Sequence, residues 1–191
     1  MTAFEDSAIP LHQSEFACID FVNSVFSDYL GSGHSTDRIG SSEWLDWFVD
    51  RHGLTPDSSS PAPLDRLVAL RRDVRRVLDK WSTGIGLSAR DVRLLDEHLR
   101  AAPLRMRLAD TASGLEVWEE PLERSWDWVM ASVATSAVEL MRDGEPLRLK
   151  TCGNPDCSWV FYDETINRSK RFCSTTPCGS LIRVRRFRER A

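Results

Sequence analysis

The sequence predicts a mainly α-helical protein in two parts. The first is a helical N-terminal domain with a small β-hairpin, over residues 1–144, and the second is a compact cysteine-rich finger over residues 148–191. Apolar residues recur at helical spacing through most of the first part. Four of the five cysteines then lie within 27 consecutive residues near the C-terminus.

Composition and length are consistent with one medium-sized domain and one small module. The 191 residues are 41% hydrophobic and 28% charged, as is usual for a soluble globular protein. No apolar run approaches the roughly 20 residues that cross a bilayer. The acidic N-terminus lacks the basic and apolar segments of a signal peptide. We therefore expect a cytoplasmic protein without membrane contact, whose cysteines remain reduced.

Five helices are expected in the first part. Ser41 or Ser42 begins the second of them, and Ser88 with Asp91 has the pattern of a capping box. Pro121 is expected at the start of the last, because proline is tolerated in a first helical turn. A Gly- and Ser-rich loop over 31–41 separates the first two. The expected helices span residues 14–29, 43–52, 64–81, 89–100 and 121–142.

One stretch of the first part has the periodicity of strands. Residues 104–118 alternate apolar and polar side chains on either side of Asp-Thr-Ala-Ser-Gly, which predicts a β-hairpin. Six tryptophans give the surrounding helices ample apolar area for a core. Residues 143–146 then have the composition of a linker.

The four C-terminal cysteines have the spacing of a metal site. They occur as two close pairs, which are Cys152 with Cys157 and Cys173 with Cys178. Paired thiolates beside turn residues suit tetrahedral zinc. Core cysteines, two disulfides and a catalytic zinc are the alternatives. Four thiolates would fill the zinc shell, and none of the four histidines lies in this module, so we expect one structural zinc ion.

The pattern around the cysteines predicts a treble-clef-like zinc finger. The first pair lies on a turn, and residues 159–162 are expected to form a strand. A loop over 163–170 would lead to a return strand over 171–173, and the second cysteine pair would begin a helix. The fifth cysteine, Cys18, lies in an apolar helix and is expected to be a buried hydrophobic side chain.

The sequence resembles a known bacterial family along its whole length. Residues 152–190 resemble the CGNR-type zinc finger, and the segment Phe-Ala-Cys-Ile-Asp-Phe-Val-Asn-Ser-Val at 16–25 resembles the opening segment of the same proteins. This family is predicted to comprise stress-related transcription regulators, so the resemblance implies a regulator with four cysteine ligands. Ser180 and Leu181 stand where the family has Asn and Arg, so an amide and a guanidinium group are missing.

Charge divides unequally between the two parts. Residues 1–147 carry 15 Lys and Arg against 25 Asp and Glu, whereas residues 148–191 carry 10 against 4. A basic module on an acidic domain suggests an anionic partner, which is usually nucleic acid. This charge pattern does not distinguish DNA from RNA. The candidate contact residues are Arg168, Lys170, Arg171, Arg183, Arg185, Arg186 and Arg190.

The C-terminal helix is expected to be amphipathic. Leu181, Val184 and Phe187 would share a face that packs on the zinc knuckle, and the arginines would occupy the other side. The alternative is that these cations only balance the negative zinc site or form a solvated face.

Two polar residues of the first helix are candidates for a ligand pocket. Asp20 and Asn23 lie on or beside its apolar face, where they either bind a small effector or join an internal polar network.

No catalytic motif is present, so an enzyme is not expected. The sequence and the resemblance favour a DNA-binding transcription regulator, with a small-molecule effector and a homodimer as further candidate partners. A protein-interaction module that docks on an acidic surface, and an enzyme or ligand-binding protein with its site in the helical domain, are the alternatives.

Overall fold

The computed structural model describes residues 14–57 and 60–190. Residues 1–13, whose composition predicts no signal peptide, lie outside this range. So do two residues of the loop before the third expected helix and the last residue of the finger.

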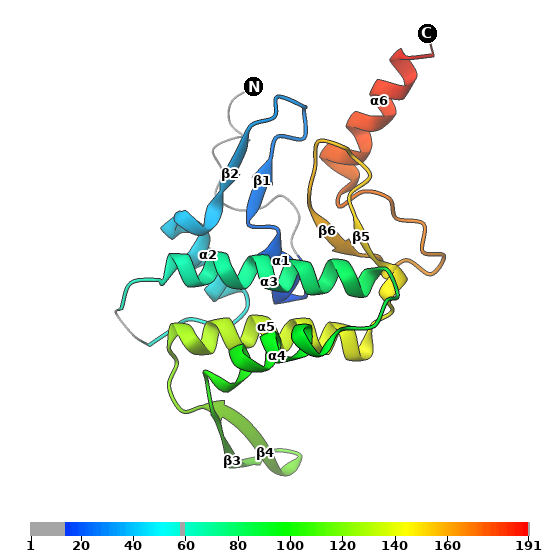
Figure 1. The fold of residues 1–191 in the computed structure, drawn as a ribbon. Coiled ribbons are helices and arrows are strands. Elements are labelled where there is room, and N and C mark those ends of the chain that lie inside the picture. The colour runs from blue at the N-terminus through cyan, green and yellow to red at the C-terminus, as the bar shows by residue number, and fades with distance from the viewer. Residues whose placement is uncertain (1–13, 58–59, 191) are drawn as a thin grey trace.

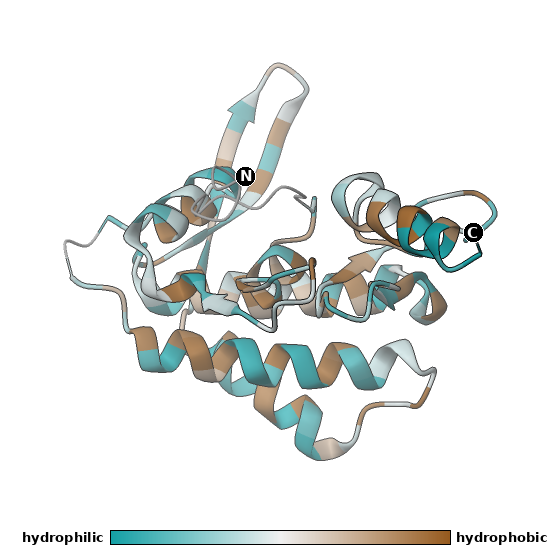
Figure 2. Cartoon of the chain, turned by 90° about the horizontal axis from the view of Figure 1, so that it is seen from above, coloured by the Kyte–Doolittle hydropathy of each residue, from teal (hydrophilic) through white to brown (hydrophobic). Residues whose placement is uncertain are grey.

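Helices make up about half of the described chain, and three long ones form a layer (Figure 1). Figure 2 shows apolar and polar residues alternating along these helices, as an amphipathic pattern requires. The α-helices are α1 (Ala17–Val22), α2 (Ser42–Arg51), α3 (Leu64–Ser82), α4 (Ala89–Arg100), α5 (Trp126–Asp143) and α6 (Ser180–Arg188). Three shorter helical turns are η1 (Arg38–Gly40), η2 (Pro146–Arg148) and η3 (Thr175–Gly179).

The described strands form three separate two-stranded antiparallel sheets. Each sheet joins strands that are neighbours in the sequence, so no strand crosses over another. The strands are β1 (Val25–Ser27) with β2 (Ser35–Asp37), β3 (Leu104–Thr111) with β4 (Gly114–Pro121), and β5 (Leu149–Thr151) with β6 (Val160–Tyr162).

One main core joins the helical layer to the C-terminal part. Trp44 stacks on Phe48 with ring centroids 5.2 Å apart, and Phe21 of α1 packs against both rings. Leu149 of β5 and Val160 of β6 belong to this same buried cluster. The strands that carry the cysteine knuckle therefore share a core with the helices.

Several expected elements are confirmed. Ser41 caps α2 by accepting a hydrogen bond from the Trp44 amide, and Ser88 with Asp91 forms the expected capping box at the start of α4. Helix α3 follows the expected span, and the predicted hairpin is β3–β4. None of the helices in the described ranges has the length and apolar character needed to span a membrane.

The expected helix over 14–29 is confirmed only over Ala17–Val22, and the expected loop over 31–41 is wrong. Helix α1 ends at Val22, because the next residue, Asn23, turns to bond the backbone of β6. Val25–Ser27 is then strand β1, and its partner β2 and the turn η1 occupy the expected loop.

The expected start of the last helix in the first part and the expected strand pairing in the finger are also wrong. Pro121 ends β4 opposite Leu104, and α5 begins at Trp126 rather than at Pro121. In the finger, residues 171–173 form no strand. Strand β6 instead pairs with β5, which precedes the first cysteine pair.

Candidate metal centre and the basic helix beside it

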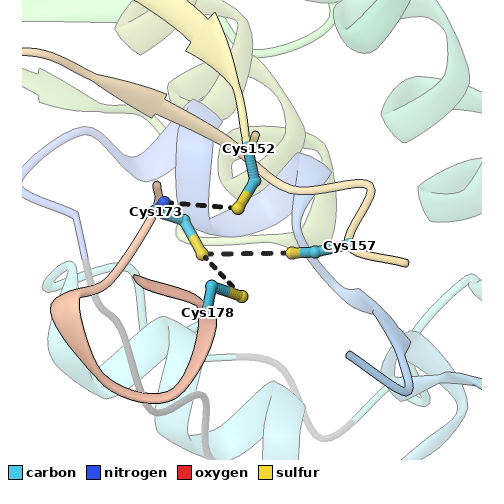
Figure 3. A group of neighbouring side chains, drawn as sticks. All are labelled: Cys152, Cys157, Cys173 and Cys178. Atoms are coloured by element: carbon cyan, nitrogen blue, oxygen red, sulfur yellow. Dashed lines mark hydrogen bonds between the residues drawn. The ribbon is translucent and has the colours of Figure 1, made fainter. Parts of the chain in front are cut away.

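The four C-terminal cysteines converge on one point (Figure 3). All four side chains are buried, and their sulfur atoms lie within 4.8 Å of one another. The Cys173 Sγ is 3.9 Å from the Cys157 Sγ and 3.8 Å from the Cys178 Sγ. A tetrahedral zinc ion with Zn–S bonds of about 2.3 Å places its sulfurs about 3.8 Å apart. The four cysteines are therefore positioned to hold a single structural zinc ion.

The charge of four sulfurs in one cluster needs a cation. Hydrogen bonds with Cys157, Cys173 and Cys178 lower the pKa of the Cys152 thiol, whereas hydrogen bonds with Cys152, Cys173 and Cys178 raise the pKa of the Cys157 thiol. The cluster alone therefore lowers the pKa of some of its thiols and raises that of others, whereas a bound zinc ion would stabilise all four as thiolates.

Backbone and amide groups support the sulfurs from outside. The Cys173 amide lies 3.5 Å from the Cys152 Sγ, and the Asn154 side-chain amide lies 3.7 Å from the Cys178 Sγ. That Asn154 amide also donates to the Tyr29 carbonyl at 3.1 Å, which ties the knuckle to the segment after β1. Such outer contacts orient the ligands around the metal.

The knuckle is fixed to the N-terminal part by three hydrogen bonds, two of them buried and one partly buried. The Asn23 amide donates to the Val160 carbonyl at 2.8 Å, and the Val160 amide donates to the Asn23 Oδ1 at 2.9 Å. The Trp159 indole donates to the Val25 carbonyl at 2.8 Å. A cavity of about 20 Å³ between Trp159, Phe26 and the cysteines leaves room for about one water molecule, so this junction is closely packed.

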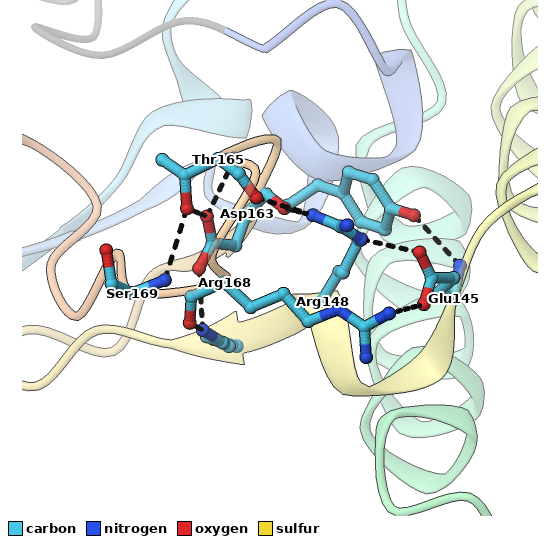
Figure 4. Close-up of polar contacts among 8 residues, drawn as sticks. Glu145, Arg148, Asp163, Thr165, Arg168 and Ser169 are labelled. Carbon is cyan, nitrogen blue, oxygen red and sulfur yellow. Dashed lines mark hydrogen bonds and ion pairs between the residues drawn. The ribbon is translucent and has the colours of Figure 1, made fainter.

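A second polar network holds the loop after β6 (Figure 4). The fully buried Asp163 accepts hydrogen bonds from the Lys150 Nζ at 2.6 Å and from the Thr165 amide at 3.0 Å. Burial raises the pKa of Asp163, but the bonds from Lys150 and Thr165 outweigh it and hold the pKa well below its usual value. Sequence reasoning missed this residue, although Asp followed two positions later by Thr is a recognisable turn signal.

The candidate nucleic-acid contacts fall into two groups. Within the described part of the chain, the exposed side chains of Arg183, Arg186 and Arg190 form no ion pair. Arg185 behaves differently, because it donates to Asp156 at 2.7 Å and to the Leu30 carbonyl at 2.7 Å.

The three basic residues of the loop, Arg168, Lys170 and Arg171, differ in how openly their side chains face solvent. Arg168 pairs with Glu145 across the network of Figure 4. The Lys170 Nζ lies 5.1 Å from the centroid of the Phe161 ring, and the Arg171 side chain is exposed. The loop therefore presents Arg171 most openly.

The expected apolar face of the C-terminal helix is wrong in one respect. Ile182 of α6 is the buried residue, whereas Val184 is 47% and Phe187 74% exposed. The helix leaves the finger after its first turn, so its later apolar positions reach no core. Figure 2 shows apolar and polar residues side by side along this helix, near the C-terminus.

Asp20 and Asn23 are both buried and both fully engaged. Asp20 accepts from the Ser14 amide at 2.7 Å and lies 3.1 Å from the His52 Nε2 and 3.4 Å from the Arg51 Nε. Neither residue lines either of two hollows in the helical part, of about 660 and 420 Å³. A ligand pocket at this pair remains a prediction.

The fold and the site together define a helical protein that carries a structural zinc finger. A family model described as a putative stress-induced transcription regulator, ABATE, matches residues 15–144, and the CGNR zinc finger matches residues 148–191. The chain belongs to the ABATE family. Its description is that of a regulator rather than an enzyme. No curated protein matches the sequence.

Proposed function

We propose that the chain is a DNA-binding transcription regulator whose helix α6 contacts the phosphates of duplex DNA. The observation that supports this most directly is the exposure of Arg183 and Arg186 on α6, which begins beside the zinc site, and of Arg190 just after the end of this helix. Guanidinium groups bind phosphate bidentately and keep their charge at any physiological pH.

The zinc ion would act as a scaffold for this helix. Cys178 is a ligand two residues before α6 begins, and Ile182 buries the first turn against the finger. The remainder of the helix extends away from the body, where it can approach a duplex. The exposed Phe187 lies among the arginines and suits contact with sugar or base surfaces in a groove.

The arrangement also bears on the alternative of docking to the acidic N-terminal part. Arg185 and Arg168 already pair with acidic side chains of the same chain, at Asp156 and Glu145. Arg183, Arg186 and Arg190 are exposed and form no ion pair with an acidic side chain among the described residues. DNA is therefore the better match for them.

The test is a mobility-shift titration of random duplex DNA over a salt series. Wild-type protein should bind at low salt, and its affinity should fall steeply as salt rises. Replacing Arg183, Arg186 and Arg190 together by Ala should abolish retention under the conditions at which wild-type protein binds, and any residual binding at lower salt should have a salt slope smaller by about 3. Duplex RNA and single strands serve as competitors.

A matched control removes the same charge elsewhere. Arg90, Arg93 and Arg100 are exposed on α4, so replacing these three by Ala should leave binding unchanged. Equal loss in both variants would show that only net charge matters. Full retention in the α6 variant would contradict the proposal.

A further inference from the structure

The longest sheet among the described residues has little packing against the rest of the described chain. Strands β3 and β4 pair over eight positions, from Leu104 opposite Pro121 to Thr111 opposite Gly114. They project from the helical layer, and no described helix or strand packs extensively against them (Figure 1). A two-stranded hairpin alone is marginally stable in water, so this exposure calls for an explanation.

The two faces of the hairpin differ sharply. Residues that alternate along a strand share a face, and directly paired residues lie on the same side. One face is apolar, and its large side chains are between 53% and 74% exposed. They are Leu104, Met106, Leu108, Leu115 and Val117.

The opposite face is polar and internally paired. Arg105 and Arg107 form ion pairs with Glu120, and the Trp118 indole donates to Glu116 at 3.1 Å. Antiparallel sheets commonly turn one such face to water and bury the other. Here the solvent face is complete, but the face with the composition of a core has no cover among the described residues.

We propose that this apolar face is the interface of a homodimer, stacked on the same face of a second copy. Each of the five side chains exposes roughly 100 Å², so two copies together would remove roughly 1,000 Å² from water. That area reaches the lower bound of a specific interface before any polar rim is counted. When the same patch of both copies forms the interface, the two copies are related by a two-fold axis.

The register permits such stacking without a clash of charges. Asp110 and Glu119 are the charged residues of the face, and they lie in different rows, opposite Leu115 and Met106. If the hairpins stack antiparallel, each acidic row meets an apolar row of the other copy. Both strands are edges, so these carboxylates can still reach water.

Charge argues against other classes of partner. The face carries two carboxylates and no basic side chain, which disfavours nucleic acid and anionic membranes. It also lies at the opposite end of the molecule from α6, so the dimer and the DNA contact are independent (Figure 1).

The test is sedimentation velocity of the zinc-loaded full chain between about 1 and 100 µM, the range expected for a small interface. Wild-type protein should dimerise within this range. Val117→Lys places a charge in the apolar face and should weaken the dimer at least about tenfold. Trp118→Lys is the matched control, because Trp118 is 55% and Val117 58% exposed, on opposite faces.

Three results would overturn the proposal. A wild-type monomer at every concentration would exclude a second copy as the occupant. A dimer that persists in Val117→Lys would place the interface elsewhere or along the strand edges. Equal dissociation by Trp118→Lys would show that the apolar face has no special role. Circular dichroism and zinc content establish that each variant is folded.

Discussion

Two antiparallel ribbons in this protein have opposite relations to the rest of the fold. The β5–β6 sheet has three residues in each strand, yet Leu149, Val160 and Phe161 are almost fully buried. The β3–β4 hairpin has eight residues in each strand, yet its large apolar side chains are mostly exposed. The short sheet is held in place by Asn23, by the main core and by the metal site. The long sheet is held mainly by the hydrogen bonds between its own two strands.

The difference shows that strand length is a poor guide to local stability. Backbone pairing contributes little net free energy when water offers equivalent hydrogen bonds, whereas burial and cross-linking contribute much. The metal-bearing ribbon should therefore open only with the whole protein. The hairpin should open alone, at a low free energy.

The largest effect is expected from loss of a metal ligand. Cys173→Ser should release the zinc ion, and structural zinc contributes about 10–16 kcal/mol in finger peptides, comparable to the total stability of a domain. The finger and α6 should unfold and the melting temperature should fall. Zinc content and circular dichroism measure both changes. A variant that keeps one zinc and the wild-type melting temperature would contradict a structural role.

The next largest effect is expected at the junction between α1 and β6. Asn23→Leu leaves both the amide and the carbonyl of Val160 buried without their partner, at a cost of about 2–4 kcal/mol. Chemical denaturation measures this loss. Ser27→Ala is the control, because it removes only an exposed contact to Ser158 across the same junction and should cost under about 0.5 kcal/mol.

An intermediate and pH-dependent effect is expected at Asp163. Its pKa is lowered in the folded protein. Its contribution to folding stability is therefore fully present above the unfolded-state pKa of about 3.9 and is lost as the pH falls through the folded-state pKa. Asp163→Asn should reduce stability at pH 7 and flatten the decline below about pH 4. Unfolding curves between pH 7 and pH 2 test this. Parallel curves for the two proteins would show that Asp163 has no such role.

The smallest global effect is expected at the turn of the hairpin. Gly114 has a φ of +114°, which side chains rarely adopt, although a Cβ there would meet no neighbour. Gly114→Ala should speed amide exchange in β3 and β4 and leave the melting temperature within about 2 °C. A large drop in melting temperature would mean that the hairpin is coupled to the core after all.

Local signals in the sequence were sufficient for much of the fold. The capping residues Ser41 and Ser88, the amphipathic pattern of α3 and the alternation of β3–β4 are all properties of short segments. The paired cysteine spacing likewise predicted which side chains meet in the metal centre, because few other arrangements of four close thiols are useful to a protein.

The errors share one physical cause, which is long-range contact. Helix α1 stops because Asn23 bonds a residue 137 positions later, and no local pattern records that bond. The partner of β6 precedes the knuckle instead of following it for the same reason. The exposure of Phe187 could not be predicted either, since periodicity shows which residues share a face but not whether anything covers that face.

Cys18 lies apart from the four cysteines of the metal site, so it can serve as an internal standard for chemical labelling. Its thiol is fully buried in α1, and burial raises its pKa to about 12, so alkylating reagents should not reach it in the native fold. Metal extraction from an intact helical core would expose four reactive sulfhydryls, and complete denaturation would expose all five. A simple titration of modified sites would therefore distinguish demetallation from global unfolding in the same sample.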